Sequence, residues 1–208
     1  MSKKTTIKRW SVFLKTRKIA KTPTTNRFIA RLNLSRKFKG INADGFGAET
    51  LRGYSALLSV FLAYSAFECF ANSIKENEYL ASTNLIVNLK INKYRHVFSN
   101  VKLENELRKN TDLIEMLFEY ADVDVERKDT QRIERLMLFY MGNSDLHLIA
   151  SAIRNVVAHG QLTVGGGRVM TKRNADVLFG LARLIEKECE KQFTKYVYLL
   201  EKKYPKLN

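Results

Sequence analysis

The sequence predicts an all-α protein, a helical bundle preceded by a basic N-terminal arm. Only ten glycines and two prolines occur in 208 residues, few for a β protein whose strands need many turns. Hydrophobic residues make up 45% of the chain, enough to bury one core. Apolar residues recur at helical spacing over long stretches with few breakers. We therefore expect an arm or helical extension over residues 1–43 and a helical domain over residues 44–208.

The positive charge is concentrated in the arm. Residues 1–43 hold thirteen of the 36 Lys and Arg and no acid, so the remaining 23 basic residues nearly balance 21 acidic ones, although the net charge is +15. Aromatic residues alternate with the cations, so that bases could stack while cations meet phosphates. A solvated arm fits this pattern equally well. The expected RNA contacts are Lys8, Arg9, Trp10, Lys15, Arg17, Lys18, Arg36 and Lys37.

The first helices follow from apolar spacing and breakers. Short helices are expected around Trp10 and around Phe28, separated by Pro23, and residues 48–75 predict a long central helix. The middle of this helix approaches the roughly 20 apolar residues that cross a bilayer. Because Glu68 and several serines interrupt it, we expect a helix buried inside the bundle and no membrane contact.

The second half of the chain is also expected to be helical. Asn143 or Ser144 can cap a helix that Gly160 ends, and Thr171 can start a long last helix with an apolar stripe. The stretch "LTVGGGRVM" favours a short extended hairpin near 161–170. The other expected helices span about 79–90, 103–121 and 131–140.

The helix that ends at Gly160 carries an unusual polar group within "SAIRNVVAHGQ". At 100° per residue, Asn155 and His159 stack on one side with Ser151 one turn earlier, and Arg154 lies beside them. An imidazole exchanges protons near neutral pH, and a guanidinium offers forked donors to phosphate oxygens. The pattern predicts phosphodiester chemistry. An ordinary helix terminus, with cations near its negative end, explains it about as well.

The segment "IRNVVAHG" resembles the R-x4-6-H signature of the HEPN superfamily, in which Asn, Asp or His usually follows the arginine. The resemblance implies a HEPN-type helical bundle and a metal-independent endoribonuclease whose cleft forms where two motif helices meet. By this match Arg154, Asn155 and His159 are the catalytic residues. Glu68, in a segment similar to the long early helix of the superfamily, would support the site together with Ser151. A carboxylate that merely caps or faces solvent is the alternative for Glu68.

No metal or other cofactor is expected. Cys69 and Cys189 form no C-x-x-C pair, and His96 and His147 match no zinc motif. Isolated cysteines suit a reducing compartment, and the apolar run "WSVFL" is too short for a secretion signal, so we expect a cytoplasmic protein.

The leading hypothesis is therefore a homodimeric endoribonuclease that cleaves RNA by attack of the 2′-hydroxyl, for example as a toxin or defence effector. The first alternative is a non-catalytic RNA- or ribosome-binding protein in which the arm supplies the function. The second is a helical module of a toxin–antitoxin pair, whose antitoxin covers the motif.

Overall fold

The protein is all-α, as its sequence predicts. The computed structural model describes residues 23–75, 100–114, 146–158 and 170–203, which contain no strand. The hairpin expected near 161–170, and the helices expected around Trp10 and at 79–90 and 131–140, lie outside these residues except for Met170. The helices are α2 (Pro23–Lys37), α3 (Ala48–Lys75), α6 (Val101–Arg108), α9 (Leu146–Ala158) and α10 (Lys172–Lys203).

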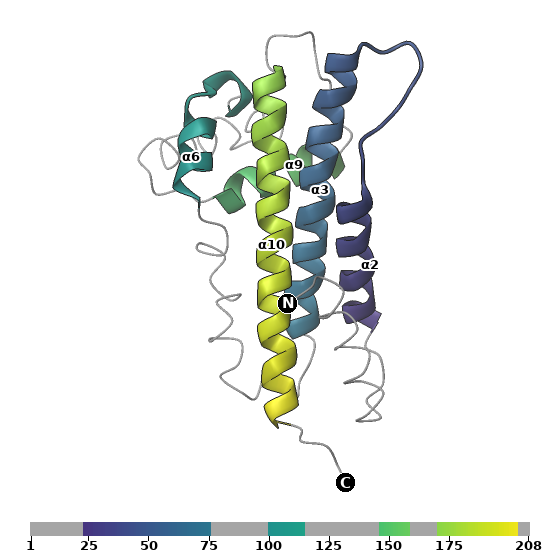
Figure 1. The fold of residues 1–208 in the computed structure, drawn as a ribbon, viewed down its shortest axis with the longest axis vertical. Helices are drawn as coiled ribbons and strands as arrows, with labels where there is room; N and C mark the ends of the chain where they lie inside the picture. The colour runs from purple at the N-terminus through teal and green to yellow at the C-terminus, as the bar shows by residue number, and fades with distance from the viewer. Residues whose placement is uncertain (1–22, 76–99, 115–145, 159–169, 204–208) are drawn as a thin grey trace, which may run out of the picture.

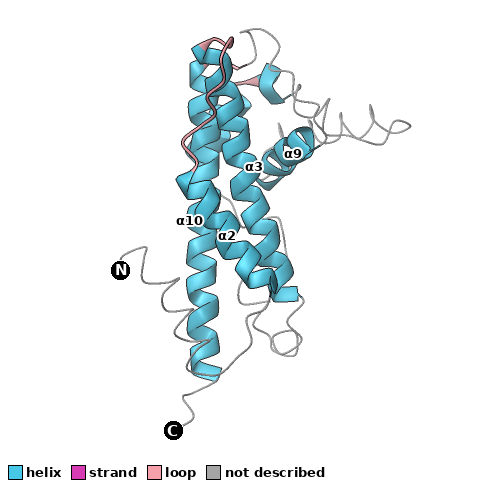
Figure 2. Ribbon diagram, turned by 90° about the vertical axis from the view of Figure 1, so that its right-hand side faces the viewer, coloured by secondary structure: helices cyan, strands magenta, loops and turns pink. Residues whose placement is uncertain are grey.

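Helices α3 and α10 form the long axis of the bundle and run in the same direction, with α2 antiparallel beside them (Figure 1). Arg52 near the start of α3 is ion-paired with Asp176 near the start of α10. Farther along, the ring centroids of Phe70 and Phe193 lie 6.0 Å apart. Helix α9 crosses α3 obliquely; it lies behind α3 and α10 in the view of Figure 1 and beside α3 in that of Figure 2. The predicted helix 48–75 and the predicted last helix are confirmed.

Helix α2 belongs to the core of the bundle. The Phe28 side chain is fully buried, and its ring centroid lies 4.9 Å from that of Phe70 and 5.1 Å from that of Phe193. Each such aromatic pair contributes about 0.5–1.5 kcal/mol beyond the area it buries. The second part of the predicted basic arm is therefore a packed helix.

Polar contacts fix α2 against its two neighbours. The guanidinium of Arg31 donates to the hydroxyl of Ser65 on α3, and the hydroxyl of Ser35 donates to Glu186 on α10. Arg36 Nη2 lies 2.8 Å from Glu190 Oε2, also on α10. Because these three contacts join α2 to both α3 and α10, they fix the register of α2 in the bundle.

Helix α6 lies against the first half of α10. A Cβ at Gly180 would lie 3.3 Å from Leu103 Cδ1, so the small residue lets the two helices approach closely. The sequence predicted one helix over 103–121, but α6 ends at Arg108 and helical structure resumes at Thr111. The amide of Asn110 donates to the backbone carbonyl of Glu106 at 2.7 Å, which replaces the next turn of helix.

Helix α3 is long and apolar enough to cross a membrane, judged by length and composition. Its window Ala48–Ser73 has a mean hydropathy of 1.4, and 61% of that window is buried inside the protein. The same properties belong to a central helix covered by α2, α9 and α10, which is the arrangement seen here.

A candidate polar site between α3 and α9

Helix α9 presents one apolar face to the bundle and one polar face outward. Leu146, Ile149, Ile153 and Val156 are buried, and Val157, which helical spacing places on the same face, is half-buried against the core. On the other side Ser151, Arg154 and Asn155 are half-exposed and Ala158 is exposed. The burial of four large aliphatic side chains positions α9, so the polar residues are free to serve another purpose.

Three polar side chains meet where α9 crosses α3. Arg154 Nε lies 3.4 Å from Glu68 Oε2, and Arg154 Nη1 donates to Asn155 Oδ1 at 2.9 Å. The carboxylate and the amide together restrain the guanidinium. Because an arginine has five N–H donors, most of them stay available for an anion in solution. The structure thus brings three of the sequence-predicted site residues together.

The contact between Glu68 and Arg154 orients the arginine more than it stabilises the fold. Their side chains are 36% and 38% exposed. Ion pairs as exposed as this contribute about 0–1 kcal/mol, because water screens the charges and both side chains lose conformational freedom. The four buried aliphatic residues of α9 outweigh that contribution several times over.

A second polar contact joins the same two helices near the start of α9. The hydroxyl of Tyr64 lies 3.3 Å from both ring nitrogens of His147, and the two ring centroids are 5.3 Å apart. His147 and Arg154 are seven residues apart, and Tyr64 and Glu68 are four apart, so each pair shares a helix face. Burial lowers the pKa of His147, which keeps the imidazole neutral.

Acidification should destabilise the protein through His147. The unfolded chain takes up a proton near pH 6.5, whereas the folded protein resists it because the folded pKa is lowered. The free energy of unfolding should therefore be unaffected by this group well above pH 6.5 and fall as the pH drops below it. Urea titrations between about pH 7.5 and 5.5 measure this. His147→Gln should flatten the dependence, and an unchanged dependence would rule out this histidine as its source.

The remaining predicted site residues divide between the described and undescribed parts of the chain. Lys37 is exposed on α2, but the guanidinium of Arg36 is already engaged by Glu190. Arg36 is thus held in the bundle rather than presented to a ligand. Outside the described residues lie His159, Lys8, Arg9, Trp10, Lys15, Arg17 and Lys18.

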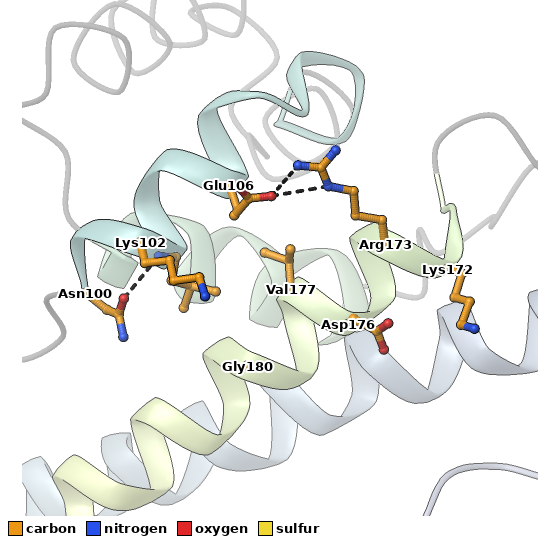
Figure 3. A pocket seen from close by; sticks show the side chains of 9 residues that line it. Asn100, Lys102, Glu106, Lys172, Arg173, Asp176, Val177 and Gly180 are labelled. Atoms are coloured by element: carbon orange, nitrogen blue, oxygen red, sulfur yellow. Dashed lines mark hydrogen bonds and ion pairs between the residues drawn. The ribbon is translucent and has the colours of Figure 1, made fainter.

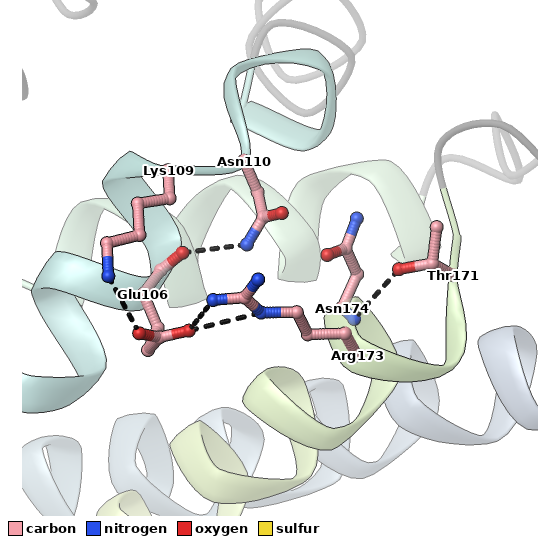
Figure 4. A network of polar contacts seen from close by, with 6 residues as sticks. All are labelled: Glu106, Lys109, Asn110, Thr171, Arg173 and Asn174. Atoms are coloured by element: carbon pink, nitrogen blue, oxygen red, sulfur yellow. Dashed lines mark hydrogen bonds and ion pairs between the residues drawn. The ribbon is translucent and has the colours of Figure 1, made fainter.

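An open groove lies between α6 and the first turns of α10 (Figure 3). Its charged groups are largely paired: Glu106 accepts hydrogen bonds from Arg173 and Lys109, which lower the pKa of this carboxyl (Figure 4). Two further cations, Lys102 and Lys172, line the rim without an ion-pair partner in the part of the chain that is described. The groove is lined by Asn100, Lys102, Leu103, Glu106, Lys172, Arg173, Asp176, Val177 and Gly180.

Cysteine, histidine and carboxylate side chains do not gather into a metal site within the described ranges. Cys189 is buried, which raises the pKa of its thiol, and Cys69 is half-buried. Neither thiol forms a disulfide. The site described here therefore consists of Glu68, Arg154 and Asn155, with Ser151 on the neighbouring turn of α9.

The pairing of Tyr64 with His147 could not be predicted, because no local pattern links two residues so far apart in the chain. The cations on α10 were not among the predicted site residues. Their signal was present, since Arg183, Lys187 and Lys191 recur at every fourth residue.

We compared the chain with models of known protein families, with curated proteins and with solved structures, and it matches none of them.

Proposed function

We propose that the protein is an endoribonuclease that cleaves RNA by attack of the 2′-hydroxyl on the adjacent phosphorus. The single observation that supports this most directly is the restrained guanidinium of Arg154, between Glu68 and Asn155 on the outward face of α9. An arginine held in this way offers forked donors to a phosphate at little further cost in side-chain entropy. His159 follows α9 directly after Ala158 in the chain and supplies the titratable group.

The reaction needs a base, an acid and a stabiliser of negative charge. A neutral imidazole removes the 2′-hydroxyl proton, and the 2′-oxygen forms a bond to phosphorus while the bond to the 5′-oxygen breaks. An imidazolium gives a proton to that leaving oxygen. The products are a 2′,3′-cyclic phosphate and a free 5′-hydroxyl. The guanidinium of Arg154 stabilises the charge that develops on the phosphate oxygens.

Two copies of the chain supply the base and the acid in this proposal. One chain contributes a single His159, and the outward face of α9 carries the small residues Ser151 and Ala158. A two-fold contact on this face would bring the two motifs together and place both histidines at one phosphate.

Cleavage of single-stranded RNA in excess EDTA tests the activity. We expect the wild-type protein to cut an all-ribose RNA without added metal and to leave the matching 2′-O-methyl RNA intact, because only the ribose offers the attacking hydroxyl. Intact ribose RNA after incubation with folded wild-type protein would favour the non-catalytic alternatives. Co-purification of a second protein under native conditions would favour the toxin–antitoxin alternative.

Glu68→Gln should separate orientation from stability. The amide keeps the size of the side chain but loses the charge that restrains Arg154, so we expect kcat to fall by about tenfold or more. KM should stay unchanged or decrease, because a negative charge near the phosphate is removed. The free energy of unfolding should change by less than about 1 kcal/mol, as is usual for an exposed ion pair. Wild-type kcat in this variant would show that Glu68 does not position the arginine.

A further inference from the structure

A row of cations lies along the outer face of α10. Arg183, Lys187, Lys191 and Lys195 follow one another at every fourth residue, and all four side chains are exposed. At 1.5 Å per residue the row is about 18 Å long, and successive members lie on adjacent turns of the same side. We call these four residues the cationic row.

The acidic side chains of the same stretch neutralise the row only in part, because Glu188 pairs with Lys191 alone. Each acid between residues 172 and 195 is engaged by a described side chain: Asp176 by Arg52, Glu186 by Ser35, Glu188 by Lys191 and Glu190 by Arg36. Arg183, Lys187 and Lys195 have no ion-pair partner within the described ranges. The row is therefore locally positive, although residues 44–208 are nearly neutral by count.

An aromatic ring lies on the same face as the row. Tyr198 is 48% exposed and follows Lys195 by three residues. At 100° per residue, Tyr198 falls within the angular range that the four cations cover. Cations that follow a backbone, together with an exposed ring, form the usual pattern of surfaces that bind single strands.

We propose that the cationic row binds single-stranded RNA, with phosphates on Arg183, Lys187 and Lys195 and an unpaired base stacked on Tyr198. The linear spacing of the cations matches a chain of regularly spaced negative charges, and the ring distinguishes an unpaired strand from a duplex. This inference rests on the proposal that RNA is the substrate. It adds a set of binding residues on α10 to those proposed on α9 and in the basic arm.

Binding of a 2′-O-methyl RNA to the full chain tests the row independently of cleavage, since this RNA lacks the attacking hydroxyl. Arg183→Gln/Lys187→Gln removes two charges and keeps residues that favour helix. If each cation neutralises one phosphate, the slope of log affinity against log salt should become less steep by about 1.4. The matched control is Lys102→Gln/Lys172→Gln, which removes two exposed charges from the groove between α6 and α10.

Tyr198→Leu tests the stacking. The affinity for the single strand should fall by roughly fivefold or more, while the affinity for a duplex of the same sequence stays unchanged. Equal losses on the single strand and the duplex would overturn the assignment of Tyr198.

Four results would overturn the proposal for the row. The first is a wild-type protein that does not bind the 2′-O-methyl RNA, and the second is an equal salt slope in the wild type and the α10 double variant. The third is an equal change of slope in the control double variant. The fourth is an α10 double variant that loses binding to phosphatidylserine vesicles while it retains RNA binding. The proposed nuclease activity is measured separately, as cleavage of ribose RNA. Wild-type cleavage with unchanged salt slopes would reject the row alone, and the expected slope change without any cleavage would reject the nuclease alone.

Discussion

Replacing His159 by alanine is expected to lower the rate of RNA cleavage by roughly 10²–10⁴-fold, the usual contribution of a positioned acid or base. The proposed reaction transfers one proton from the 2′-hydroxyl and one to the 5′-oxygen, and alanine can do neither. The rate is measured as initial cleavage of a short ribose RNA at saturating substrate in EDTA. Thermal unfolding should change little, because the substitution removes no residue of the buried face of α9.

His96→Ala is the matched control for this experiment, because His96 belongs to no motif. It should cleave RNA at the wild-type rate. If folded His159→Ala protein also cleaves at that rate, the proton-transfer role of His159 is wrong. The polar residues of α9 would then be explained as those of an ordinary helix end.

Replacing Ala158 by arginine is expected to abolish cleavage by separating the two copies of the chain. Ala158 is exposed on the outward face of α9, so the fold itself has room for the larger side chain. A two-fold contact would place the new charge on both sides of the interface, where the two charges repel each other. Light scattering should show a monomer, and cleavage should fall to background although Arg154, Asn155 and His159 are all present.

Ala30→Arg makes the same chemical change on the exposed side of α2 and serves as the control. This variant should keep the oligomeric state and the activity of the wild type. A monomeric Ala158→Arg protein that cleaves RNA at the wild-type rate would contradict a shared site and confine the chemistry to one chain.

The long helices could be predicted from the sequence because their signals are local. The mostly apolar segment 48–75 contains no helix breaker after Gly53, and the apolar stripe after Thr171 recurs at helical spacing over several turns, so local sequence identifies both helices. The break after Arg108 could not be predicted in the same way. At this break the Asn110 side chain donates a hydrogen bond to a backbone carbonyl. A single asparagine in an otherwise helical pattern is only a weak signal for such a bond.

The candidate site was predictable only in part. The face of α9 that carries Arg154 and Asn155 follows from helical spacing, and these two residues are in contact in the structure. The approach of Glu68 depends on how α3 and α9 cross, which no local pattern specifies; the expectation came from the family resemblance. The cationic row was missed because a count of charges over residues 44–208 does not separate paired from unpaired side chains.

The attachment of α9 has a consequence for local stability. Within the described ranges, helices α2, α3 and α10 contact one another through the cluster around Phe28 and through ion pairs such as Arg36 with Glu190, whereas α9 contacts chiefly α3. A helix held mainly by one neighbour detaches at a lower free energy than the global unfolding, so its amide hydrogens exchange through sub-global openings. Each such opening separates Arg154 from Glu68. A second chain packed on the outward face of α9 would oppose these openings, so the persistence of the site would increase with protein concentration.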